Sequence, residues 1–348
     1  DINGEDERVP ASLTKIMTAV VLLDKFKGDE QKLKDTYYSA GSEAFDELYD
    51  TGASTADIQP GEEVSCYDLL AALLIPSSCE AANIIALNVS DSITGFTDLM
   101  NEKAEKLGME NTHFSNAHGL WAQQNYSSCK DMATLCEYAI SKYQVFRDIV
   151  CLPSYHMAST SYHSDGTDIY NTNLMLDSMT DYYYSYAKGI KTGTLDSAGR
   201  CLASYAEYEG TTYLIVTMGA PMDKLEEDVK KGEEDPDSIY GGDNVYYNLL
   251  DHINLYKWAF SSLVATDFVD KDSEVRDVKV SYGDGIDYAN LKPANGFTRL
   301  WPVDISVNDV EKKITVYDNV VAPVEVGDVL GLSLIHISEP TRRRGISY

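Results

Sequence analysis

The 348-residue sequence lacks the patterns that are typical of metal sites and membrane spans. Its six cysteines form no Cys-x-x-Cys pair and its six histidines form no His-Glu-x-x-His motif, so we expect no metal and no cofactor. No apolar run reaches about 18 residues, so we expect no membrane-spanning helix. Basic residues are few, 28 against 56 acidic ones, and the net charge of -28 argues against nucleic acid or an anionic membrane surface as a partner.

The most apolar helical run covers residues 12–27 and has almost no polar face, which places it in the centre of a domain. Pro10 and Gly28 are typical of a helix start and a helix end. Ser12 and Lys15 lie three residues apart, so they share one face of the first turn. A serine is a good nucleophile only when a neighbour takes its proton, and a lysine can do so when burial keeps it neutral. The pair is therefore a candidate nucleophile and base.

Spacing alone does not establish this role, because Ser-x-x-Lys occurs three times in the chain. The copy at Ser127 and Lys130 precedes an amphipathic helix and is explained by helix capping. The copy at Ser185 and Lys188 lies in a tyrosine-rich extended stretch without helical periodicity. The other motifs of the chain must decide whether Ser12 is the reactive one.

With 44% apolar residues and 25 tyrosines, the chain is long and apolar enough for two folded domains. Residues 29–64 and 223–243 are expected to be irregular surface segments, and every element past about 266 has the pattern of a short strand. We therefore expect a helix-rich α/β domain over 1–265 and a small all-β domain over 266–331. Helices are expected over residues 12–27, 65–74, directly after 76, 94–107, 129–143 and 245–260, and strands over 190–192, 201–207 and 212–218.

Neither end of the sequence has the pattern expected of a natural terminus. The buried helix begins within a dozen residues of Asp1, so we expect a truncated N-terminus. Residues 332–348 change in composition, with the single acidic residue Glu339 against three arginines at 342–344. Residues 332–342 also resemble the translation of a transposon adapter used in sequencing libraries. We therefore expect 332–348 to be a non-native, disordered tail.

Two further motifs indicate chemistry. Ser77 and Cys79 follow Pro76 between two apolar helices, where Ser77 with Glu80 can alternatively be read as a helix capping box. Lys-Thr-Gly at 191–193 is unique in the chain and lies in a predicted strand. A lysine in a strand usually faces solvent, but a glycine there often marks a place where another segment approaches the backbone closely.

Taken in order, these three motifs resemble those of the serine penicillin-binding proteins and serine β-lactamases. The closer resemblance is to the low-molecular-weight D-alanyl-D-alanine carboxypeptidases of peptidase family S11, over roughly residues 5–331. It implies a penicillin-binding domain, an antiparallel sheet with helices on both faces, followed by a small β-rich domain. It also implies an extracytoplasmic enzyme, secreted or bound to the cell envelope, with a secretion signal and an anchor outside this sequence. The resemblance depends on 10–18 (Pro-Ala-Ser-Leu-Thr-Lys-Ile-Met-Thr), 100–104, 107–109, 111–112, 118–120, 189–193 and 198–199.

The resemblance also implies catalytic roles. Ser12 would attack the carbonyl of the penultimate D-alanine of a peptidoglycan stem peptide, and Lys15 would accept its proton. Ser77 would relay a proton to the leaving amine. Lys191 would stay charged and keep Lys15 neutral by like-charge repulsion. Water would then hydrolyse the acyl-enzyme, and β-lactams would trap the same serine.

Substrate contacts follow from the same comparison. Thr192 would hydrogen-bond the terminal carboxylate, and the backbone N–H groups of Ser12 and Thr194 would form the oxyanion hole. The substrate-binding set implied by the resemblance is Cys79, Thr192, Gly193 and Thr194.

The sequence departs from the family at four points. Cys79 stands where the family has asparagine, Trp121 where it has aspartate, and Leu195 where it has threonine, and no arginine matches the one that binds the substrate carboxylate in relatives. Two alternatives therefore stay open: a serine β-lactamase, and a penicillin-binding or cell-wall-binding protein without turnover, for which Cys79 is the best argument.

Overall fold

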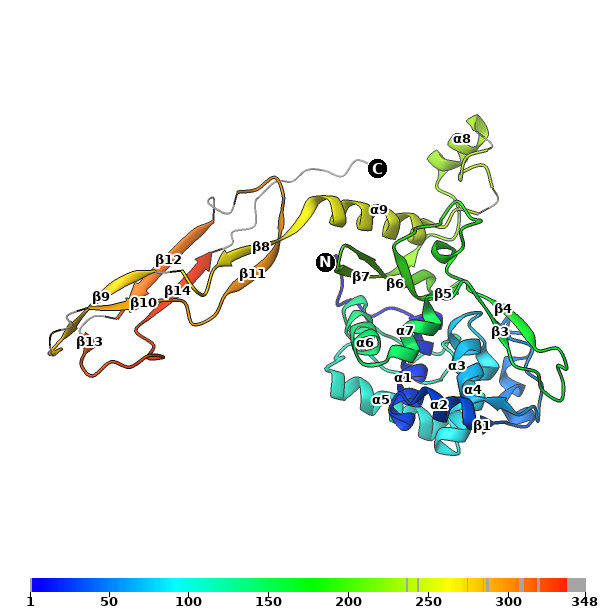
Figure 1. Ribbon diagram of the computed structural model, residues 1–348. Coiled ribbons are helices and arrows are strands. Elements are labelled where there is room, and N and C mark those ends of the chain that lie inside the picture. Colours follow the sequence, from blue (N-terminus) through cyan, green and yellow to red (C-terminus); the bar gives the residue numbers. More distant parts are fainter. Residues whose placement is uncertain are drawn as a thin grey trace. The chain divides into compact units, whose positions relative to one another are not determined.

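The computed structural model describes residues 2–235, 237–242, 244–273, 275–283, 285, 288–306, 310–317 and 320–336. The chain forms two compact units, Asp1–Tyr256 and Lys257–Tyr348. The first contains most of the helices and the sheet β5–β7, and the second consists of strands that follow the end of helix α9 (Figure 1).

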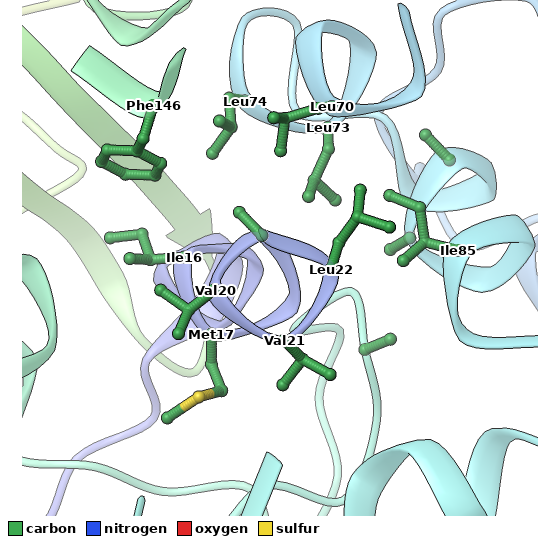
Figure 2. Close-up of a cluster of buried hydrophobic side chains, with 14 of the residues drawn as sticks. Ile16, Met17, Val20, Val21, Leu22, Leu70, Leu73, Leu74, Ile85 and Phe146 are labelled. Atoms are coloured by element: carbon green, nitrogen blue, oxygen red, sulfur yellow. The ribbon is translucent and has the colours of Figure 1, made fainter. Parts of the chain in front are cut away.

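Helix α1 (Thr14–Phe26) is the centre of the first unit, as its all-round apolar character predicts. Every residue from Thr14 to Leu23 is buried. Figure 2 shows its side chains meeting those of α3 and α4 and Phe146 of α7. Each fully buried apolar side chain of this size contributes about 1.5–3 kcal/mol to folding. The helix ends at Lys27, which is left-handed, and Gly28 is left-handed as well.

Three helices of the first unit were not expected from the sequence, and one of them, the short α7 (Gln144–Val150), directly follows the expected helix over 129–143. Residues 29–64 were expected to be irregular, but α2 (Glu30–Asp35) forms there, begun by Asp29 and held by the buried Leu33. Residues 223–243 contain α8 (Glu226–Glu234), whose acidic first turn suits a helix N-terminus. The other elements of this region are α3 (Cys66–Leu74), α4 (Cys79–Ser90), α5 (Ile93–Leu107), α6 (Cys129–Lys142), α7 (Gln144–Val150), the 3-10 turns Ala11–Leu13, Ser42–Ala44, Asp46–Leu48 and Leu174–Leu176, and the short strand pairs β1 (Tyr37–Tyr38) with β2 (Val64–Ser65) and β3 (Ser154–Met157) with β4 (Thr167–Tyr170).

Serine side chains cap four of these helices. At helix α4, the Oγ atom of Ser78 accepts the N–H of Ala81 at 3.0 Å, so the alternative interpretation of Ser77 as the cap is wrong. Glu80 is not part of a capping box either, because its carboxylate accepts hydrogen bonds from residues 55 and 56. The caps of α3, α5 and α6 are Ser65, Ser92 and Ser128.

The sheet of the first unit has the order β5 (Ala187–Leu195), β6 (Gly199–Tyr208), β7 (Thr211–Ala220), all antiparallel. Alternate residues of β6, such as Cys201 and Ala203, pack into the main core against α6. The opposite face carries Ser204, which bonds to His252 and Tyr256 of α9 (Tyr247–Ser262). Helices therefore cover both faces of the sheet, as the resemblance implies.

The second unit consists of paired strands around a small core of Val278, Val280 and Val320. None of the helices in the described part of the chain combines the length and apolar character that a membrane crossing needs. The strands pair as β8 (Leu263–Val269) with β11 (Phe297–Pro302), β9 (Arg276–Ser281) with β10 (Tyr288–Leu291) and β13 (Val320–Val321), and β12 (Glu311–Val316) with β14 (Gly331–His336).

Strand β14 corrects the interpretation of the C-terminal segment. Residues 332–336 were expected to be disordered, but they pair antiparallel with residues 311–315. The expectation was based on the change in charge composition at 332, although residues 332–335 contain two leucines and an isoleucine, which are compatible with a strand. Residues 337–348, the rest of the expected tail, lie outside the described part of the chain.

Candidate active site

Ser12 and Lys15 lie where the 3-10 turn Ala11–Leu13 continues into α1. The amine of Lys15 is fully buried, 3.1 Å from Ser12 Oγ, 3.3 Å from Cys79 Sγ and 2.6 Å from the carbonyl oxygen of His118. A neutral lysine amine has two N–H bonds and one lone pair. If the two N–H groups point at His118 and Cys79, the lone pair faces the hydroxyl of Ser12.

Burial lowers the pKa of Lys15 below that of an ordinary lysine, and the neighbouring Cys79 and Glu80 partly oppose this. Lys191 of β5 is also buried, and its Nζ donates to the carbonyl of Thr192 at 3.1 Å. Burial lowers the pKa of Lys191 well below its usual range, and the charge of Lys15 lowers it further. The lowered pKa of Lys15 agrees with its expected neutral state, whereas the lowered pKa of Lys191 runs against its expected positive charge.

Two strained residues border the site. Ala11, directly before Ser12, has φ 47° and Ser77 has φ 71°, both in the left-handed region that residues other than glycine rarely adopt. Such strain persists only where surrounding contacts impose it, and it is often found at active sites. Ser77 is buried, and its Oγ has no hydrogen-bond partner among the described residues. Since Ser78 makes the cap, the hydroxyl of Ser77 is not used in capping α4.

Two glycines allow other segments to pack against the serine turn. A Cβ on Gly193 would lie 3.1 Å from both the Ala11 Cβ and the backbone nitrogen of Ser12. A Cβ on Gly119, which has φ 84°, would lie 2.0 Å from the carbonyl oxygen of Ala11. The segment that approaches Gly193 closely, as its place in a strand predicted, is therefore the turn that carries the serine.

The hydroxyls of β5 lie on the face opposite to Lys191. Thr192 is half-buried and its Oγ1 is 2.5 Å from Oγ1 of Thr172, a residue that precedes the turn Leu174–Leu176. Thr194, two residues further along the strand, is exposed. Thr172 was not identified from the sequence, because nothing local connects it to a strand 20 residues later.

A second contact that was not expected from the sequence holds the His118 carbonyl in place. Nδ1 of His118 accepts the N–H of Leu120 at 3.1 Å, so Nε2 carries the proton and donates to Glu47 at 3.0 Å. Asn83 donates to the same Glu47 oxygen at 2.9 Å. Burial lowers the pKa of His118, partly offset by Glu47. The tripeptide at 118–120 was part of the family resemblance, but no sequence signal pointed to Glu47.

The Ser-x-x-Lys copy at Ser127 and Lys130 does not form such a site. Ser127 is buried and bonds to Thr112, while Lys130 is exposed and pairs with Glu5. Trp121, one of the departures from the family, is 64% exposed. Within the described residues, no group of three or more histidine, cysteine, aspartate or glutamate side chains is arranged to hold a metal ion.

Comparison with known proteins identifies D-alanyl-D-alanine carboxypeptidases as relatives of this chain. The profile of peptidase family S11, described as D-alanyl-D-alanine carboxypeptidase, matches residues 1–222. The D-alanyl-D-alanine carboxypeptidase DacF of Bacillus subtilis is 27% identical over 335 residues, which cover 94% of this chain and 75% of DacF. DacC of Escherichia coli is 32% identical over 239 residues, 64% of this chain and 53% of DacC, so the chain spans about half of that relative.

Solved structures show the same fold. Penicillin-binding protein 5 from Haemophilus influenzae has a TM-score of 0.68 at 21% identity, covering 97% of this chain and 88% of its own. The DD-transpeptidase of Streptomyces K15 has a TM-score of 0.56 at 30% identity, covering 63% and 83%. Its solved forms include a serine-to-alanine variant and, two positions later, a cysteine-to-asparagine variant.

Proposed function

The chain belongs to the D-alanyl-D-alanine carboxypeptidase family, and from that premise we propose that it removes the terminal D-alanine from peptidoglycan stem peptides through an acyl-enzyme on Ser12. The observation that carries the proposal is the position of the buried Lys15 amine, 3.1 Å from the Ser12 hydroxyl. The reaction would take place outside the cytoplasm in cell-wall metabolism, and β-lactams would inhibit it by acylating the same serine.

The first step forms the bond between Ser12 Oγ and the carbonyl carbon of the penultimate D-alanine. Neutral Lys15 takes the hydroxyl proton, and the N–H groups of Ser12 and Thr194 receive the negative charge on the carbonyl oxygen. The close packing of Gly193 on the Ser12 nitrogen supports this pairing of donors from two segments. One such donor contributes about 3–4 kcal/mol to lowering the barrier.

The second step breaks the peptide bond and releases D-alanine. The proton held by Lys15 must reach the leaving amine, and the unpartnered hydroxyl of Ser77 is suited to relay it. A water molecule then attacks the acyl carbonyl, gives a proton back through Lys15 and restores Ser12. Binding of an anionic substrate raises the pKa of a nearby lysine, so the substrate carboxylate would favour charged Lys191 in the complex.

A second candidate activity is transfer of the acyl group to an amine in place of water. It is favoured by one observation: Cys79 lies two residues after Ser77, and a solved relative named as a DD-transpeptidase has a cysteine two positions after a serine that was also substituted. Both activities share the acylation step and differ only in the acceptor.

One set of assays tests the proposal. Wild type and Ser12→Ala are incubated with a penicillin, followed by intact mass, and with a peptide ending in D-Ala-D-Ala, with and without an added amine such as glycine. We expect a stoichiometric adduct and D-alanine release in the wild type alone, since the substitution leaves no large cavity and keeps the fold. An adduct on Ser12→Ala would show that another residue is the nucleophile. Rapid release of opened penicillin would instead indicate a β-lactamase, and an adduct without D-alanine release a binding protein.

A further inference from the structure

The peptide group between His118 and Gly119 is the strongest hydrogen-bond partner of the Lys15 amine. Its carbonyl oxygen lies 2.6 Å from Lys15 Nζ, whereas the sulfur of Cys79 lies at 3.3 Å and is a weak acceptor. The N–H of the same peptide group donates to Oδ1 of Asn116 at 2.6 Å. The direction in which the amine points therefore depends more on this peptide group than on the thiol.

Glu47 fixes the other side of the same residue, the imidazole of His118. The ring is almost fully buried, and its Nε2 donates to the Glu47 carboxylate at 3.0 Å. A buried donor that loses its acceptor is unfavourable, so without Glu47 the ring would turn toward another acceptor or toward water. Such a turn would also break the bond between Nδ1 and the N–H of Leu120, which ties the ring to the backbone two residues later. The carboxylate of Glu47 therefore controls the position of the backbone that holds Lys15.

Asn83 connects Glu47 to the helix that carries Cys79. The side chain of Asn83 is fully buried in α4, and its Nδ2 donates to Oε1 of Glu47 at 2.9 Å. Asn83 and Cys79 are four residues apart, so they lie on the same face of the helix. The contacts thus form a closed ring, from the Lys15 amine through His118, Glu47 and α4 back to the thiol. In such a ring the position of each member depends on the others, and a displacement of about 1 Å near a reacting group can lower a rate about 100-fold.

We propose that Glu47 is a positioning residue for the acylation of Ser12: acting through His118, it holds the amine of Lys15 toward the serine hydroxyl. The proposal rests on the proposed function, in which Lys15 is the base. What Glu47 supplies is a hydrogen-bond acceptor, since its side chain is 51% exposed and water screens its charge. The competing interpretation is that Glu47 only stabilises the 3-10 turn Asp46–Leu48.

The first test measures the rate constant of acylation by benzylpenicillin with intact mass spectrometry. The final amount of adduct counts the folded sites, so the rate constant is independent of any loss of folded protein. We expect Glu47→Ala to lower it by about 10- to 100-fold. Glu47→Gln should stay within about threefold of the wild type, because its amide oxygen can still accept the N–H of His118. The matched control is Glu43→Ala, since this exposed carboxylate in the neighbouring turn accepts the N–H of Gly41 instead.

The second test combines Glu47→Ala with Cys79→Asn. An amide at position 79 gives Lys15 a second strong partner, so the amine then depends less on the His118 carbonyl. The fold-loss caused by Glu47→Ala should therefore be smaller in the Cys79→Asn background, by at least about twofold, the lower limit for residues that belong to one network. A residue that only stabilises its own turn would cause the same fold-loss in both backgrounds.

An equal loss in both backgrounds, or no loss in either, would overturn the proposal. If Glu47→Ala does not fold, Glu47→Asp and Glu47→Gln decide the question. The aspartate keeps the charge but is one methylene group too short to reach His118, so a slow Glu47→Asp with a fast Glu47→Gln supports the proposal, and any other order of the two rates refutes it. A wild type that penicillin does not acylate would refute the proposed function itself, which is a separate outcome because no variant would then react.

Discussion

The amine of Lys15 lies 3.3 Å from the sulfur of Cys79, the position where the family resemblance led us to expect an asparagine. A thiol is a weak hydrogen-bond acceptor and a weak donor, whereas an asparagine accepts and donates strongly. The proposed base is therefore held firmly only by the His118 carbonyl, at 2.6 Å. The contact with Cys79 orients the amine less well than an amide oxygen would.

Replacing Cys79 with asparagine should speed up acylation. The amide can hold Lys15 and contact the substrate, which is worth roughly 1–3 kcal/mol near developing charge, or about 10- to 100-fold in rate. The measurement is the rate of penicillin adduct formation or of D-alanine release. Cys151→Asn, at a half-buried cysteine at the end of α7, serves as a control. Unchanged or lower rates for Cys79→Asn would mean that the site is adapted to the thiol.

Gly193→Ala should impair acylation more than it impairs folding. The new Cβ would lie 3.1 Å from the Ser12 nitrogen, so this oxyanion donor must move by a few tenths of an ångström. We expect the acylation rate to fall at least about tenfold; complete loss of such a donor typically lowers a rate by about 10²–10³-fold. Overpacking should also lower the free energy of unfolding by about 1–3 kcal/mol. Gly242→Ala is the matched control, since a Cβ there meets no atom within 4 Å. Full activity in Gly193→Ala would argue against Ser12 N–H as a donor.

The acylation rate should rise with increasing pH, and the rise should occur at a pH below the pKa of an ordinary lysine. Only neutral Lys15 can take the serine proton, and burial lowers its pKa. The base is therefore increasingly available as pH rises through this lowered pKa, and the midpoint should lie below the ordinary lysine value of about 10.4. A penicillin adduct assay from pH 5 to pH 10 checks this, in wild type and with the protein-free reaction subtracted. A rate that stays low and rises only near pH 10.4, where an ordinary lysine loses its proton, would contradict the prediction.

The first unit should lose stability as pH falls below about 6.5, the pKa of a histidine in the unfolded chain. His252 is buried between Ser204 (2.7 Å) and Thr217 (3.0 Å), and burial lowers its pKa to about 3. Between these values the unfolded state binds a proton that the folded state does not, so stability decreases with decreasing pH, by up to roughly 5 kcal/mol in total. Urea unfolding at pH 7 and pH 5 should show a smaller difference for His252→Gln than for the wild type. An equal difference would assign the acid sensitivity to other groups.

Removing β14 should destabilise the second unit. A chain that ends after residue 330 loses the partner of β12 along six residue pairs, and an exposed strand edge favours association. A chain that ends after His336 keeps the strand and is the matched comparison. Thermal unfolding should show a lower melting temperature for the shorter chain, by several degrees. Identical melting curves would restore the interpretation of residues 332–336 as a tail without structural role.

The features that the sequence predicted are those encoded by local periodicity and by turns. Ser12 and Lys15 share a helix face, the apolar run around them became the central helix, and the Glu-Gly turn at 209–210 joins β6 and β7. The errors come from competing local patterns: Ser77 and Ser78 are equally good caps by sequence, and only the backbone path selects Ser78.

The remaining contacts depend on strand register or on distant segments. Glu47 reaches His118 across 71 residues, and Arg200 lies beside Thr194 only because β5 and β6 pair in one particular register. No pattern in the sequence contains this information. The second unit shows the same limit, since the charge composition at 332 changes while the strand pairing continues through 336.

Gly119 has a consequence for how this protein can vary. Its missing Cβ is the reason that the carbonyl oxygen of Ala11 can lie where it does, and every amino acid that a single base change could introduce in place of glycine carries a Cβ. Almost any coding change at this codon should therefore distort the serine turn, while silent changes at its third base are free. Under antibiotic selection, a lineage could alter Cys79, but it would have to keep this glycine.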